Sequence, residues 1–259
     1  MTKFVAITSG KGGVGKTICT INLAYILNSI GRRTIIVDAN FTTPNISLYL
    51  GSPTVPVTLH DVIEGKKHIR DALYIHPSGI KVIPSNISLR SIKNVDSSRL
   101  NAALLDLAGM ADYVLIDSPP GINQHLKPVL ENADETLIVT QPELAAVTDA
   151  LKTAKLASRL NSTVIGAVIN RKGFHKNEME IENVQTLLDM PILGIIPEDK
   201  NIMYSLLVKH PLTYIKPESL ASLSFKELAF KVTGEAFREI VTEKKPFGES
   251  LLKTIGLKK

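Results

Sequence analysis

Residues 9–17 decide the fold, and they read Ser9-Gly10-Lys11-Gly12-Gly13-Val14-Gly15-Lys16-Thr17. The stretch follows a short apolar run at 4–7, which predicts a buried strand, and precedes an apolar run at 18–27 with helical periodicity. A strand, a glycine-rich turn and a helix start ending in Gly-Lys-Thr is the layout of a phosphate-binding loop. Because glycine has no Cβ, the backbone amides of such a turn can approach an anion, and the helix start adds the positive end of its dipole.

Two side chains of this loop suit phosphate chemistry directly. Lys16 can reach the β- and γ-phosphates of a nucleotide, and the Thr17 hydroxyl can ligate Mg²⁺. A second lysine, Lys11, lies inside the loop, although an ordinary phosphate-binding loop does not require it. We expect a nucleotide to contact the loop and the residue after it: Gly10, Lys11, Gly12, Gly13, Val14, Gly15, Lys16, Thr17 and Ile18.

Composition and charge bound the class of protein. With 259 residues, 44% hydrophobic and 21% charged, the chain suits one large α/β domain of ordinary globular composition. Its net charge of +5 allows nucleic acid or an anionic membrane surface as a partner but requires neither. The single cysteine excludes an intramolecular disulfide or a cysteine pair for zinc or an iron–sulfur cluster, and favours the reducing cytoplasm. We expect no transmembrane helix and no signal peptide, because no apolar run approaches about twenty residues and the first strand begins near the N-terminus.

The alternation of strand and helix patterns predicts an α/β fold, a mostly parallel central sheet flanked by helices on both faces. Further strands are expected at 34–37, 113–117, 136–140, 164–169 and 192–196, and a strand pair at 73–75 and 80–83. Helices are expected at 16–29, 58–64, 97–109, 144–160, 177–188 and 218–244. No repeat or low-complexity linker interrupts the pattern, so we predict a single domain at 1–245 and a short tail at 246–259.

Two of the predicted strands end in a carboxylate, at the edge where open α/β sheets bind ligands. Asp117 follows four apolar residues, the arrangement in which a carboxylate holds the Mg²⁺ shell of a bound nucleotide. The loop after it, 118–121, is rich in Pro and Gly and suits a segment that responds to the γ-phosphate. Asp38 ends the earlier strand and is followed by Asn40. We therefore predict Thr17, Asp38 and Asp117 as metal-binding residues.

The sequence KGGVGKT, with Lys11 as its first residue, resembles the deviant Walker A motif of the MinD/ParA family of P-loop ATPases. Segments 117–121 and 140–143 look most like the MinD-like branch, and the resemblance extends from the first strand through 197–199. It implies ATP and Mg²⁺ as cofactors and a homodimer with ATP at the interface. In that dimer, Lys11 reaches the phosphates of the nucleotide bound by the other subunit.

The resemblance also implies what the chain does. The catalytic group would comprise Lys11, Lys16, Asp38 and Asn40. The implied role is an ATPase that acts as a spatial-positioning or assembly switch, in cell division or in the placement of another cellular machine. An activating or cargo protein is expected, and the sequence does not name it.

Asn40 departs from the family pattern, which usually reads Asp-x-Asp after this strand, with the second Asp beside the attacking water. An amide can orient a water molecule but cannot accept its proton. Phosphoryl transfer, however, depends more on positioning and charge neutralisation than on a strong base. We therefore expect slow hydrolysis and a long-lived ATP-bound dimer. The alternative is that Asn40 merely caps a turn.

Two later segments resemble the adenine-binding segments of the family. Asn170 and Arg171 follow one predicted strand, and Pro197 and Glu198 follow the next. An amide such as that of Asn170 can both donate to and accept from the edge of adenine, and the Pro197 loop would pack on the base. Taken alone, Asn and Pro at strand ends are usually turn residues.

The tail at 246–259 is short and basic, with lysines before it at 244–245 and at its end. If it is helical, its apolar residues share one face: Phe247, Leu251, Leu252 and Ile255. Such tails attach MinD-like proteins to membranes, and two copies in a dimer would supply avidity. We expect a cytoplasmic protein peripherally associated with the anionic inner face of the cell membrane. The alternatives are a tail docked on its own domain, a partition ATPase that binds DNA non-specifically, or a nucleotide-gated scaffold with slow turnover.

Overall fold

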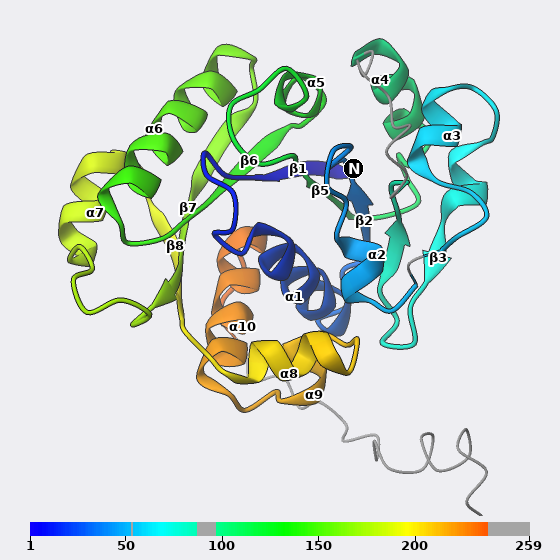
Figure 1. Cartoon of the computed structure of the whole chain (residues 1–259). Coiled ribbons are helices and arrows are strands. Elements are labelled where there is room, and N and C mark those ends of the chain that lie inside the picture. The colour runs from blue at the N-terminus through cyan, green and yellow to red at the C-terminus, as the bar shows by residue number, and fades with distance from the viewer. Residues whose placement is uncertain (53, 87–96, 238–259) are drawn as a thin grey trace, which may run out of the picture.

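A computed structural model describes residues 1–52, 54–86 and 97–237, so the tail predicted at 246–259 lies outside the described residues. Within these ranges the chain forms an eight-stranded sheet in the order β3-β4-β2-β5-β1-β6-β7-β8 (Figure 1). The strands are β1 (Lys3–Thr8), β2 (Thr34–Asp38), β3 (Tyr74–Ile75), β4 (Lys81–Ile83), β5 (Tyr113–Asp117), β6 (Glu135–Thr140), β7 (Thr163–Lys172) and β8 (Ile192–Pro197). Strand β3 pairs antiparallel with β4, and the other neighbouring pairs are parallel, as the sequence predicts.

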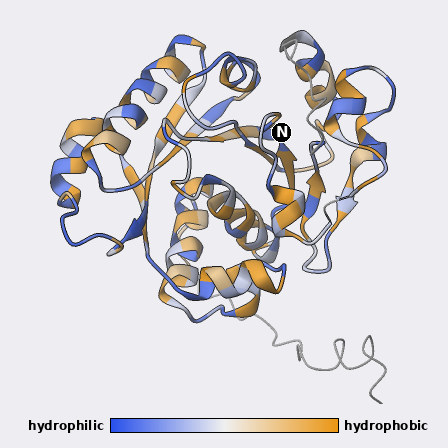
Figure 2. Cartoon of the chain, in the orientation of Figure 1, coloured by the Kyte–Doolittle hydropathy of each residue, from blue (hydrophilic) through white to orange (hydrophobic). Residues whose placement is uncertain are grey.

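Helices cover both faces of the sheet (Figure 1). One face carries α1 (Lys16–Ser29), α2 (Ile46–Tyr49), α8 (Asn201–Leu207), α9 (Leu212–Ile215) and α10 (Leu220–Thr233). The other carries α3 (Leu59–Ile63), the 3₁₀ helix η1 (Ile69–Ala72), α4 (Ser97–Leu105), α5 (Leu126–Glu131), α6 (Leu144–Arg159) and α7 (Ile181–Leu188). Because both faces are covered, the central strands have continuous apolar runs in their middle, and Figure 2 shows these runs in orange.

The side chains of β1 show how the core is divided. Val5 and Ile7 point to one face, where they join the apolar cluster built on α1 and α10. Ala6 points to the other face and joins the cluster built on α3, α4 and α5. All three side chains are fully buried, so the strand that leads into residues 9–17 is fixed between two cores. The loop therefore starts from a rigid support.

Several predicted boundaries are wrong, each for a local reason. The helix predicted at 218–244 ends at Thr233, because Gly234 takes a left-handed conformation (φ 72°) that stops it. The helix predicted from 177 begins at Ile181, because the Glu178 carboxylate accepts from the backbone N–H groups of Gly173 and His175 and holds the chain before α7 in a loop. The helix predicted to 109 ends at Leu105.

Other differences bear on the site. Helices α5, α8 and α9 were not expected, since each has seven residues or fewer and gives no clear periodic signal. Strand β7 continues to Lys172, so Asn170 and Arg171 belong to the strand rather than following it. None of the described helices is long and apolar enough to cross a bilayer.

Candidate functional site

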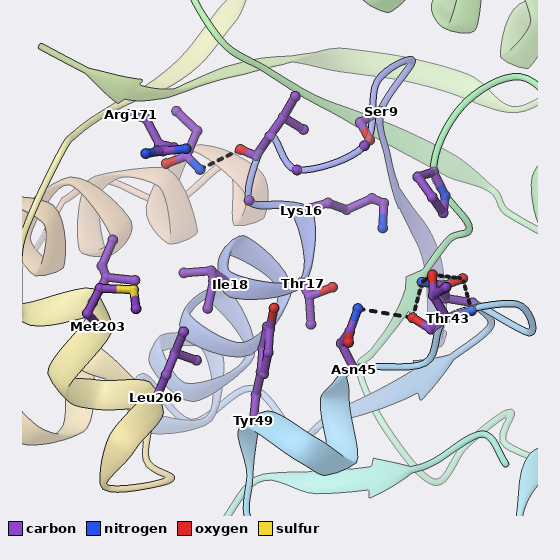
Figure 3. Close-up of a pocket in the computed structure, with 18 of the residues that line it drawn as sticks. Ser9, Lys16, Thr17, Ile18, Thr43, Asn45, Tyr49, Arg171, Met203 and Leu206 are labelled. Atoms are coloured by element: carbon purple, nitrogen blue, oxygen red, sulfur yellow. Dashed lines mark hydrogen bonds between the residues drawn. The ribbon is translucent and has the colours of Figure 1, made fainter. Parts of the chain in front are cut away.

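A cavity of about 490 Å³ opens at the carboxyl edge of the sheet, over the start of α1. Its walls come from the loop after β1, the loop after β2, the end of β7, and helices α2 and α8 (Figure 3). Predicted residues that line it are Gly12, Gly13, Val14, Gly15, Lys16, Thr17, Ile18, Asn40, Asn170, Arg171 and Glu198. The other predicted site residues do not line it: Gly10, Lys11, Asp38, Asp117 and Pro197. The structure therefore brings most of the predicted nucleotide contacts together around one hollow.

At two positions of the loop, Gly10 and Gly15, neighbouring atoms lie so close that a Cβ would not fit. A Cβ on Gly10 would lie 2.3 Å from the backbone carbonyl atoms of Asp149 in α6. A Cβ on Gly15 would lie 2.1 Å from Nδ2 of Asn170, and Gly15 also has φ +91°. The loop is thus packed against α6 on one side and against the end of β7 on the other. Its shape depends on both neighbours.

Asp117 organises the phosphate end of the cavity. Its Oδ2 accepts a hydrogen bond from Thr17 Oγ1 at 2.6 Å, and its Oδ1 pairs with Lys16 Nζ at 3.2 Å. The Lys16 and Asp117 side chains are 7% and 1% exposed, so this ion pair is shielded from solvent. A hydroxyl and a carboxylate in contact at the start of a helix are oxygen donors of the kind that Mg²⁺ takes beside a nucleotide phosphate.

Asp38 lies opposite Asp117 in the register of β2 and β5, and both carboxylates are buried. The pKa of Asp38 is raised, mainly by burial and next by the negative charge of Asp117. Backbone N–H groups of Asn40 and Ile46 donate hydrogen bonds to Asp38 and oppose this shift in part. Within residues 1–52, 54–86 and 97–237, no cluster of three or more His, Cys, Asp or Glu side chains could enclose a metal. The donor set fits a cation that takes its remaining ligands from phosphate and water, which is the usual habit of Mg²⁺.

The Asn40 side chain is engaged by its own loop. Its Nδ2 donates to the carbonyl oxygen of Thr43 at 2.6 Å, and its Oδ1 accepts from the Thr43 backbone N–H at 3.2 Å and from Thr42 Oγ1 at 3.2 Å. The structure therefore supports the turn-capping alternative. It also places Asn40 on the cavity wall, so a role beside a bound phosphate is compatible with the same position.

Lys11 does not line the cavity of its own chain. Its Nζ lies 3.0 Å from Oε2 of Glu143, and its side chain is 44% exposed. Glu143 is the residue directly before α6. The loop thus holds two lysines in different surroundings, since Lys16 is buried against Asp117 while Lys11 is at the surface.

Asn170 lines the cavity, and one atom of its amide has no hydrogen-bond partner among the described residues. Its Nδ2 donates to the carbonyl oxygen of Val14 at 2.7 Å, which fixes the orientation of the amide because a carbonyl can only accept. Its Oδ1 is buried and has no hydrogen-bond partner among the described residues. A buried unpaired acceptor beside a cavity suits a ligand that donates there. The exocyclic amine of adenine donates, whereas the O6 atom at the same place on guanine accepts.

Arg171 and Glu198 form the rim beside Asn170. Arg171 Nε donates to Glu198 Oε2 at 2.8 Å, and its guanidinium lies 3.7 Å from the centroid of the Phe174 ring. Arg171 has φ 59°, a left-handed conformation that is uncommon for a residue with a side chain. Such a backbone at a cavity rim is typical of functional sites.

Comparison with known proteins gives the family. A model of the ParA family described as NUBPL iron-transfer P-loop NTPase matches residues 1–233. This chain belongs to the ParA family of P-loop NTPases. An uncharacterised ATP-binding protein of Methanocaldococcus jannaschii is 34% identical over 241 residues, which cover 93% of this chain and 91% of the relative. The septum site-determining protein MinD of Synechocystis is 31% identical and covers 91% of each chain.

A solved structure supports the same family assignment. It shows the septum site-determining protein MinD from Pyrococcus horikoshii with Mg-ADP, and it superposes with a TM-score of 0.85 at 33% identity, over 90% of this chain and 96% of that one. The predicted resemblance to the MinD/ParA family is confirmed. The description of the family model names iron transfer, yet this ParA-family chain has one cysteine, Cys19, which is buried. It offers no cysteine pair to a cluster within one subunit.

Part of the cavity wall in this ParA-family chain was not predicted. Ile202, Met203 and Leu206 of α8 and Tyr49 of α2 line it. Figure 3 shows Met203, Leu206 and Tyr49 along one side with Ile18. These apolar side chains can pack against the face of a base. The spacing of Ile202 and Leu206 is helical, but seven residues are too few to distinguish such a helix from a loop.

Proposed function

We propose that this chain binds MgATP in the described cavity and that ATP joins two copies of it face to face. Thr17, Asp38 and Asp117 would hold Mg²⁺, which neutralises phosphate charge when bound. Asn170 would accept from the adenine amine while Arg171 and Glu198 border the base. The Mg-ADP bound to the Pyrococcus horikoshii MinD supports this assignment, as does the unpaired Oδ1 of Asn170.

The position of Lys11 supports the dimer. Lys11 does not line the cavity of its own chain, and its exposed side chain is accessible to a ligand presented from outside. Two exposed apolar side chains also adjoin residues that contact the loop. Ile122 is 48% exposed and follows Gly121, whose N–H donates to Ser9 at the start of the loop. Leu144, beside the Glu143 partner of Lys11, is 62% exposed. Exposed apolar side chains around a cation suit a second subunit that carries nucleotide phosphates.

Light scattering with a non-hydrolysable ATP analogue tests the dimer. We expect the native chain to dimerise with the analogue and Mg²⁺ but not with ADP. Lys11→Ala should bind the analogue with nearly native affinity and remain monomeric. Lys127→Ala is a matched control, because Lys127 is an exposed lysine of α5 that pairs with Glu131. A Lys11→Ala chain that dimerises like the native one would remove the proposal.

We further propose slow ATP hydrolysis, with the dimer acting as a positioning or assembly switch at the membrane through residues 246–259. The support is indirect: Asn40 is an amide where the family has a carboxylate, and the MinD of Synechocystis is named for septum placement. Co-sedimentation with anionic liposomes should require both the ATP analogue and residues 246–259. If a chain that ends at Lys245 pellets equally well, the tail does not anchor the protein. Binding to DNA under the same conditions would favour the partition role instead.

A further inference from the structure

Lys11 already has a partner within its own chain. Its Nζ lies 3.0 Å from Oε2 of Glu143, and the other oxygen of the same carboxylate, Oε1, lies 3.1 Å from Nε2 of His175. The three residues come from three separate segments: the phosphate-binding loop, the turn before α6, and the loop after β7. Glu143 is thus a shared anion between two groups that are far from it in sequence.

The backbone fixes Glu143 where Lys11 can reach it. The N–H of Glu143 donates to the carbonyl oxygen of Gln141 at 2.8 Å, which forms a tight turn at the end of β6. The carbonyl oxygen of Pro142 accepts from the N–H of Met179 at 2.8 Å and ties this turn to the segment before α7. The hydrogen bond from Lys11 also holds the pKa of Glu143 below its usual range. The carboxylate therefore stays charged and in place.

His175 is held as firmly on the far side of Glu143. Its N–H donates to Oε1 of Glu178 at 3.0 Å, and its ring meets the ring of Phe174 edge to face with centroids 4.4 Å apart. When Lys11 leaves, Oε1 of Glu143 therefore still has a neighbour in His175. Glu143 therefore keeps one partner after Lys11 has moved to another group.

In the separate subunit Glu143 holds the ammonium group of Lys11, and a phosphate presented by another subunit would compete with that carboxylate for the lysine. We propose that Glu143 is a positioning residue that holds Lys11 in the separate subunit, so that dimerisation exchanges Glu143 for phosphate. This inference rests on the proposed function, in which Lys11 contacts nucleotide from the partner. Glu143 thereby weakens the dimer, and it opposes dimerisation until a phosphate is present to compete for Lys11.

The size of the effect follows from exposure. The Lys11 and Glu143 side chains are 44% and 28% exposed, and an ion pair at such a surface shifts an equilibrium by roughly 1.4- to 5-fold. A symmetric dimer breaks two such pairs, so the two factors multiply. Neutralising Glu143 should tighten the ATP-dependent dimer by about tenfold in Kd. The gain should shrink as salt screens the pair.

Sedimentation equilibrium with the ATP analogue and Mg²⁺ tests this, using the full chain, Glu143→Gln, Lys11→Ala and Glu131→Gln. Glu131 is the control, because it is a carboxylate of similar exposure, 31%, that pairs with Lys127 on α5. We expect Glu143→Gln to lower the dimer Kd about tenfold at low salt and much less at high salt. Glu131→Gln should match the native chain.

The outcomes separate the two proposals. If Lys11→Ala stays monomeric while Glu143→Gln dimerises as the native chain does or more weakly, Glu143 does not hold Lys11 back, and this inference fails alone. If Lys11→Ala dimerises normally, the proposed dimer fails as well. A tighter Glu143→Gln dimer whose advantage is equal at low and high salt would indicate a change in packing rather than release of a charge, and would also overturn the inference.

Discussion

Replacing Asn40 with Asp separates the two roles considered for this residue. The substitution puts a carboxylate on the cavity wall, where the family usually carries one. It also removes the Nδ2 group that donates to the Thr43 carbonyl oxygen at 2.6 Å and brings two acceptor oxygens against each other. The same change should therefore accelerate hydrolysis and weaken the loop.

The two effects have different sizes. Thr43 is exposed, so its carbonyl oxygen can turn to water when it loses the Asn40 donor, and we expect the free energy of unfolding to fall by about 1 kcal/mol and Tm by about 2–4 °C. A positioned general base contributes roughly 10²- to 10⁴-fold in rate. Because phosphoryl transfer has a loose transition state that needs little base assistance, we expect an increase of roughly tenfold, below that range.

Single-turnover hydrolysis of ATP and thermal unfolding should be measured on the native chain, Asn40→Asp and Asn40→Ala. The alanine variant is the control, because it loses the same turn contacts without gaining a carboxylate. We expect both variants to be destabilised and only Asn40→Asp to be faster. Equal rates in the native and Asp chains would refute the argument from the missing carboxylate. An unchanged Tm in both variants would refute the argument from the turn.

Three further changes test other parts of the structure. Gly10→Ala should lower ATP affinity at least tenfold in a fluorescence titration, because its Cβ would lie 2.3 Å from the Asp149 backbone. Gly12→Ala is the control and should bind ATP normally, because its Cβ would meet no atom closer than 3.7 Å. Asn170→Ala should weaken ATP binding roughly tenfold and narrow the preference for ATP over GTP, measured by competition. Burial lowers the pKa of His76 from 6.5 to about 4, so its neutral form stabilises the fold above pH 6.5, and this contribution is lost as pH falls to 4. Between pH 7.5 and 5 the loss amounts to about 2 kcal/mol, and His76→Gln should reduce it in urea unfolding at those two pH values.

The centre of the fold could be predicted from the sequence because its signals are local. Strands β1, β2 and β5 contain continuous apolar runs, and a glycine-rich turn or a carboxylate marks where each of them ends. The end of α10 was missed although Gly234 is a common stop signal, because apolar residues at 236 and 240 continue the helical spacing beyond it. Periodicity alone could not show that the backbone reverses hand at that glycine.

The contacts within the site were less accessible to sequence reasoning. Asn170 was predicted to meet adenine, yet its amide nitrogen donates one of its two N–H bonds to the Val14 carbonyl, 156 residues away, and its oxygen has no partner among the described residues. The pairing of Lys11 with Glu143 joins residues 132 apart, and no spacing rule relates them. Such contacts depend on how the strands are ordered in the sheet, which places the ends of β6 and β7 beside the loop.

The two lysines of the loop imply an order of events under the proposed function. Both are held by carboxylates of their own chain, Lys16 by Asp117 and Lys11 by Glu143. The Lys16 pair is buried, so separating it without a substitute would leave a charge unpaired in the interior, and only a phosphate inside the cavity can replace Asp117. The Lys11 pair is exposed and weak, so it can open without nucleotide, but Lys11 gains a phosphate only from a second subunit. Nucleotide binding must therefore come first in each chain, because the phosphate that releases Lys16 in one subunit is the group that Lys11 of the other subunit needs.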